Sequence, residues 1–256
     1  MSVVTIERDG GLAVLTMTYE PQNRFTTEFV EGLRDGFHEL AEEDAVKAVV
    51  WTGGDSKYFS TGFHLDWLRE RMADNPDALS DLLYGLNAMM IETAAFPSPW
   101  SPLSSTDTRW PGMRHGRAAD FRVMGETKGF IGVPAVKLGL TYWPGMIAQF
   151  YSFLPSRVVK EMTLTGRRYT STQAQAMGYV DVLCPDEELM DASKALAREL
   201  AEGNPTAYAE IKLELRREAL RAMREDDVAA YRGLPRQAQV PGGLTTANAR
   251  ECPIPI

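Results

Sequence analysis

Cysteine and histidine are scarce in this chain, and long apolar runs are missing. Its 256 residues include two cysteines, Cys184 and Cys252, and three histidines. The cysteines are far apart and have no metal-ligand spacing, so we expect neither a disulfide framework nor a metal site, and a reducing, cytoplasmic location. No run approaches the length of a membrane span, and the first residues lack the basic and apolar segments of an export signal. The sequence therefore predicts no membrane anchor.

The chain also has no excess of positive charge. The formal net charge is -8 and the pI is about 5.1, which argues against nucleic acid as the main partner because phosphate backbones bind basic surfaces. The net charge does not exclude a local basic pocket for a phosphorylated small ligand. With 44% hydrophobic residues, a chain of this length can bury a full core and suits one large soluble domain.

The apolar spacing changes between the periods of strands and helices along the chain. It predicts strands over 3–8, 12–18, 46–52, 121–124 and 180–183, and helices over 27–41, 76–95, 157–164, 172–177 and 191–202. Thr26 and Asn75 are the expected caps of the first two helices, with Pro76 in a first turn. Alternation of strand and helix predicts an α/β core with right-handed crossovers. The Pro- and Gly-rich stretch 233–256 predicts an irregular tail.

The segment 57–68, KYFSTGFHLDWL, follows an apolar run that stops at Gly53-Gly54. Two glycines at a strand end place backbone N–H groups there, which is how proteins hold an oxyanion. The order resembles the crotonase (enoyl-CoA hydratase/isomerase) superfamily, in which a strand ending in TG leads into F-S-x-G-x-D-L. The resemblance implies that the N–H of Phe63 is half of an oxyanion hole for a thioester enolate. It also implies CoA or substrate contacts from Arg24, Lys57, Ser60, Gly62, Phe63 and Leu65.

A second block, DFRVMGETKGFIGVPAVKLGL over 120–140, resembles the superfamily pattern D-x-R-x-M followed by E-x-x-L-G-L, and the likeness extends over residues 3–215. It implies a crotonase-like spiral of ββα units over 1–190 with a C-terminal helical region over 191–232, assembled as a homotrimer or a dimer of trimers. The implied partner is an acyl-CoA, with coenzyme A as part of the substrate and no separate cofactor. Within the superfamily, the segments FRVM and AVKLGL most resemble those of Δ3,Δ2-enoyl-CoA isomerases of fatty-acid β-oxidation. Tyr142 and Trp143 match positions that line the acyl pocket, or they are core aromatics.

Three positions depart from that pattern where the chemistry is expected, and one departs where a strand is expected. Ala135 occupies the place of the family's catalytic glutamate, and a methyl group cannot carry a proton. Pro111 occupies the place of the second oxyanion donor, and proline has no N–H. Pro102 falls where the family has a central strand, which argues against a strand there. Arg114 takes the place of the hydratase's first glutamate.

The stretch 99–119, which departs from the family pattern, has two interpretations. Synonymous codons for residues 100–112, read one base back, can give VAAVLNGHALAG, which resembles the missing family segment, so we hypothesise compensating frameshifts in the gene or in its reported sequence. The alternative is a diverged insertion. Codons that never yield this reading would exclude the frameshift.

Three nearby side chains are weak candidates for a substitute acid or base. His64 replaces the family's aspartate, and imidazole side chains in general can act as acids or bases near neutral pH, although a loop histidine is more often locally hydrogen-bonded. Asp66 and Glu70 are alternative carboxylates. Arg24 and Lys57 are either CoA contacts or solvated charges. We expect weak or no enoyl-CoA isomerase activity; the alternatives are a non-catalytic acyl-CoA-binding or assembly subunit, or another crotonase chemistry such as thioester hydrolysis.

Overall fold

The computed structural model describes residues 3–54, 56, 58–98, 100–104, 118–127, 129–139 and 141–227, with only the backbone described for residues 100–104 and 138. A sheet of six strands in the order β1-β2-β4-β6-β7-β10 forms its centre. β1 and β2 are antiparallel, and the other neighbours run parallel. The strands are β1 (Val4–Asp9), β2 (Leu12–Met17), β4 (Ala48–Thr52), β6 (Trp100–Ser104), β7 (Val123–Gly125) and β10 (Val182–Cys184).

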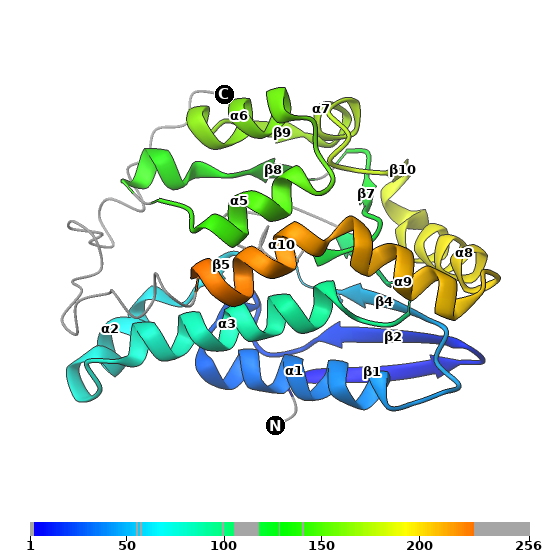
Figure 1. The fold of residues 1–256 in the computed structure, drawn as a ribbon, viewed down its shortest axis with the longest axis horizontal. Helices are drawn as coiled ribbons and strands as arrows, with labels where there is room; N and C mark the ends of the chain where they lie inside the picture. Colours follow the sequence, from blue (N-terminus) through cyan, green and yellow to red (C-terminus); the bar gives the residue numbers. More distant parts are fainter. Residues whose placement is uncertain are drawn as a thin grey trace.

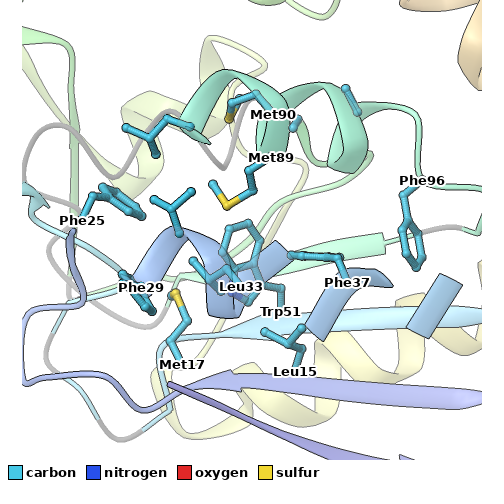
Figure 2. Packing of buried hydrophobic residues seen from close by; sticks show 14 of the residues in the cluster. Leu15, Met17, Phe25, Phe29, Leu33, Phe37, Trp51, Met89, Met90 and Phe96 are labelled. Atoms are coloured by element: carbon cyan, nitrogen blue, oxygen red, sulfur yellow. The ribbon is translucent and has the colours of Figure 1, made fainter. Parts of the chain in front are cut away.

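Helices cover both faces of this sheet because its central strands are apolar on both sides. Leu15 and Trp51 belong to the hydrophobic cluster beneath α1 (Thr27–Ala41) and α3 (Ala78–Ala94), while Val14 and Val50 belong to the cluster beneath α8 (Leu189–Ala201). Figure 2 shows the first cluster, in which the aromatic rings of α1 meet Trp51 and the methionines of α3. The alternation along β2 and β4 therefore confirms the predicted α/β class.

Helix α1 forms where its cap and its apolar spacing predict it. The Thr26 side chain accepts a hydrogen bond from the Phe29 N–H at 3.1 Å, which satisfies one free donor of the first turn. Phe29, Leu33 and Phe37 are four residues apart and fully buried. Through this apolar face α1 packs against the sheet.

A second layer of structure lies beyond the sheet, at the top of Figure 1. The helical elements here are η1 (Pro134–Leu138), α5 (Pro144–Tyr151), α6 (Ser156–Thr165) and α7 (Ser171–Ala176). Buried side chains of α5, α6, α7 and the antiparallel pair β8 (Phe130–Gly132) and β9 (Arg168–Thr170) form a separate cluster around Phe150 and Met162.

The C-terminal helices return to the first half of the chain. Helix α10 (Arg217–Ala222) and the π-helical turn η3 (Met223–Asp227) pack against α5, as Figure 1 shows for α10, and Leu220 and Met223 join the cluster beneath α1 and α3. They follow η2 (Asp186–Glu188), α8 and α9 (Pro205–Leu215). The predicted tail 233–256 lies outside the described residues. Among the helices of the described part, none is long and apolar enough to cross a membrane.

Two expectations about local structure are wrong. The chain forms the central strand β6 despite Pro102, which pairs with Trp51 of β4. Within the described residues, β7 pairs only with Leu103 and Ser104 of β6. Pro102 therefore has no ladder partner on the β7 side, and its missing N–H is tolerated there.

The second wrong expectation is the start of a helix. The helix expected from residue 76 begins two residues later, because Asn75 already ends a preceding helix through its N–H bond to the Arg71 carbonyl at 2.8 Å.

Candidate active site

The turn that precedes Phe63 is fixed by hydrogen bonds to a short neighbouring strand. β5 (Gly62–Phe63) runs parallel to β3 (Arg24–Phe25). The buried Ser60 hydroxyl donates to the Asn23 carbonyl at 2.6 Å and accepts from the Gly62 N–H at 3.1 Å. Gly62 has φ of 97°, a left-handed region that favours glycine. Ser60 and Gly62 therefore set the direction of the peptide that contains the Phe63 N–H.

Asn23 was not singled out by the sequence, yet it supports the same turn. It is buried, has φ of 47°, and its side-chain amide donates to the Phe59 carbonyl at 3.1 Å. Asparagine tolerates this backbone conformation better than most residues because its short side chain bonds locally. The available signal was an asparagine three residues before the predicted helix cap Thr26.

Arg24 forms a half-buried ion pair. Its Nε and Nη2 atoms donate to the two carboxylate oxygens of Glu20, each at 2.9 Å, and its backbone N–H donates to the same carboxylate at 2.7 Å. Burial raises the pKa of Glu20, but the hydrogen bonds from Arg24 outweigh this effect and hold the pKa below its ordinary value. The guanidinium is thus oriented by Glu20, four residues before it.

His64 is the N-cap of α2 (Leu65–Asp74). Its Nδ1 atom accepts a hydrogen bond from the Trp67 N–H at 3.2 Å, which assigns the proton of the neutral ring to Nε2. Leu65 is the first residue of the helix and is half-buried, and the exposed Asp66 pairs with Arg69 at 2.8 Å. Glu70 is exposed. The geometry of His64 matches the capping role that an aspartate would also play.

Ala135 is buried in the short 3-10 helix η1, directly after β8. The helix ends at Gly139, which has φ of 65°. Gly166 packs against the same helix so closely that a Cβ there would meet the Pro134 Cα at 3.2 Å. Ala135 is therefore fixed within packed structure.

Tyr142 and Trp143 follow that helix and lead into α5. The Tyr142 hydroxyl donates to the Val133 carbonyl at 2.9 Å, and its ring meets Phe150 edge to face at 6.3 Å between centroids. Trp143 is half-buried and has the extended backbone of an N-cap. Tyr142 thus links the start of α5 to the strand end that precedes Ala135.

The candidate residues accordingly fall into two groups, one around β3, β5 and the start of α2 and one on η1 and in the segment that leads into α5. Lys57, Pro111 and Arg114 lie outside the described residues. Within the described part of the chain, no group of three or more His, Cys, Asp or Glu side chains could hold a metal ion.

Comparison with known proteins identifies the class. A family model described as enoyl-CoA hydratase/isomerase matches residues 108–245, more than half of the chain. The chain therefore belongs to the enoyl-CoA hydratase/isomerase (crotonase) family, a family of acyl-CoA enzymes.

Individual relatives agree with this assignment. The chain is 28% identical over 207 residues to a carnitinyl-CoA dehydratase of Salmonella enteritidis PT4, covering 81% of this chain and 77% of the relative. A probable enoyl-CoA hydratase from Mycobacterium tuberculosis H37Rv has a similar crystal structure, with a TM-score of 0.82, 25% identity, and coverage of 91% of this chain and 97% of the other. Another structure of that mycobacterial protein, described as an enoyl-CoA isomerase, has a TM-score of 0.79 and 25% identity, covering 90% and 98%. These similarities confirm the predicted fold.

Proposed function

We propose that this chain binds enoyl-CoA thioesters at an isomerase-type site whose chemical step is impaired. The Phe63 N–H is assigned as an oxyanion donor, and Arg24, Lys57, Ser60, Gly62 and Leu65 as contacts on the CoA side. The observation that supports impairment most strongly is Ala135, a buried methyl group at the position of the family's base. Descriptions of one mycobacterial relative as both hydratase and isomerase support this class of substrate.

The chemistry explains why Ala135 matters so much. Moving a double bond from C3 to C2 requires a base to remove a proton from C2 and an acid to return one at C4. An oxyanion hole stabilises the enolate between these steps, but it does not transfer the proton. Positioned general acid–base groups typically contribute about 10²–10⁴-fold in rate. The chain as written is expected to bind substrate and to lose a factor of this size in turnover.

A non-catalytic acyl-CoA binder or assembly subunit is the second candidate, and the same alanine favours it. Thioester hydrolysis through His64 or Asp66 is less well supported. His64 uses Nδ1 as the cap of α2, and Asp66 is exposed and paired with Arg69. Acid production without isomerisation would indicate hydrolysis instead.

Assembly as a homotrimer or a dimer of trimers belongs to the same proposal. Helix α9 exposes large apolar side chains in the isolated chain: Ile211, Leu213 and Leu215 are 60%, 43% and 70% exposed. Such a surface is typical of a protein interface. A cytoplasmic location remains the expectation from the scarcity of cysteine.

A pair of measurements tests this function. Isothermal calorimetry with a non-isomerisable acyl-CoA should show binding, and a coupled assay on a 3-enoyl-CoA should show turnover at least about 10²-fold below that of an ordinary isomerase. Solvent-deuterium incorporation at C2 should be equally slow. Ordinary turnover would show that the base is wrongly assigned, and absent binding would contradict the function itself.

A further inference from the structure

A buried carboxylate from the C-terminal turn η3 meets the start of α5. Asp227 is 1% exposed, and its Oδ1 atom accepts a hydrogen bond from the Gly145 N–H at 2.8 Å. Helix α5 has no side-chain cap from its own N-cap residue, Trp143, and its next residue is Pro144, which has no N–H. Asp227 therefore caps this helix from 82 residues further along the chain, at the positive end of the helix dipole.

The fit between these two elements is close enough to require glycine. A Cβ at Gly145 would lie 2.5 Å from the Asp227 Oδ2 atom and 2.9 Å from the Met223 Cα. Backbone atoms cannot yield as the end of a flexible side chain can, so the start of α5 and the turn η3 have one relative position. Burying a carboxylate is costly without hydrogen-bond donors, which makes this contact a specific one.

The turn is also held at its other end. The buried Asn87 of α3 donates from Nδ2 to the Met223 carbonyl at 2.9 Å. The turn η3 is thus fixed to α3 through Asn87 and to α5 through Asp227. A π-helical turn is an uncommon structure that occurs often at functional sites.

The segment that Asp227 holds leads back to the candidate site. Tyr142 lies three residues before Gly145 in the chain, and its hydroxyl donates to the Val133 carbonyl, two residues before Ala135. A continuous path of hydrogen bonds and chain therefore runs from Asp227 to the helix that contains Ala135. Arg24 and the β3–β5 pair are not part of this path.

We infer that Asp227 is a positioning residue, which fixes residues 141–145 and so shapes the acyl side of the substrate pocket. This inference rests on the proposed function, in which Tyr142 and Trp143 line that pocket. A purely stabilising cap would lower the unfolding midpoint and leave ligand preference unchanged. A positioning role alters the affinity for the acyl chain more than the affinity for CoA.

The test compares Asp227→Ala with Asp226→Ala, a change at the neighbouring, half-exposed carboxylate of the same turn. Hydrogen–deuterium exchange should rise by about tenfold or more over residues 141–151 in Asp227→Ala, because a charge-assisted hydrogen bond is lost, and should not change in Asp226→Ala. The affinity for decanoyl-CoA should fall by about tenfold, with little change for free CoA. Asp227→Asn, which retains an oxygen acceptor, should recover much of both effects and replaces the alanine variant if that variant does not fold.

Each result has a separate meaning. Unchanged exchange over 141–151 would overturn the inference, whether or not the protein binds acyl-CoA. Faster exchange with equal losses for decanoyl-CoA and free CoA would reduce Asp227 to a structural cap and also overturn it. A parent chain that binds no acyl-CoA would contradict the proposed function, while the exchange measurement would still decide whether Asp227 fixes this segment.

Discussion

A buried ion cluster beneath α9 gives the sharpest prediction about stability. The two carboxylate oxygens of Asp120 lie 2.9 Å from the Lys212 Nζ and 2.8 Å from the Arg216 Nη2, and the three side chains are only 6%, 4% and 12% exposed. Asp120→Asn keeps the shape of the side chain and removes its charge. Two buried cations would then lack their counter-charge.

The expected cost follows from that burial. Breaking a buried ion pair typically costs about 3–5 kcal/mol, and one kcal/mol lowers the melting temperature of a domain this size by about 2–4 °C. We therefore expect Asp120→Asn to lower the melting temperature by about 6–20 °C. Asp9→Asn, in the exposed pair with Arg198, is the matched control and should cost at most about 1 kcal/mol.

Urea unfolding followed by circular dichroism measures both variants. Adding Lys212→Met to Asp120→Asn should recover part of the loss, because it removes one uncompensated cation and replaces it with an apolar side chain. A loss from Asp120→Asn no larger than that of the control would refute the account of this cluster.

Two further predictions concern titration and helix capping. Burial lowers the pKa of Lys212 to about 8, from 10.5 in the unfolded chain. The unfolded state therefore binds more protons between these pH values, so this group should make the free energy of unfolding rise from about pH 8 to pH 10.5. Lys212→Met should lack that rise in pH-dependent urea titrations, and an identical rise in the variant would contradict the assignment. His64→Ala should lower the free energy of unfolding by about 1 kcal/mol, measured by thermal unfolding, because the α2 cap is lost. His64→Asp should restore this stability and leave residual isomerisation unchanged. A loss of turnover in a stable His64→Asp protein would instead support a catalytic histidine.

The elements of the first half were predictable because their signals are local. Thr26 and the spacing of Phe29, Leu33 and Phe37 define α1 without any distant contact. Helix α2 was not predicted, since Leu68 is its only buried residue and gives little periodicity. The prediction from Pro102 was wrong because, within the described residues, this proline has no ladder partner on one side of β6. Only the order of the strands in the sheet shows this.

The candidate site was predictable only as far as its motifs extend. The segment around Gly62 and Phe63 was found from glycines and a resemblance, but strands of two residues leave no readable period, so the β3–β5 pair was not foreseen. The contact between Asp227 and Gly145 joins residues 82 positions apart and has no local signal. Such contacts arise from tertiary packing, which a single sequence does not specify.

The most direct test of the central claim is the restoration of a carboxylate by Ala135→Glu, with Ala135→Gln as the matched control. The rate of 3-enoyl-CoA isomerisation is measured in both variants and in the parent. A carboxylate at this position should raise turnover by about 10²-fold or more, while the amide, which cannot accept the proton, should not. Equal rates in all three proteins, despite preserved folding and acyl-CoA binding, would contradict the claim that the missing carboxylate limits this chain.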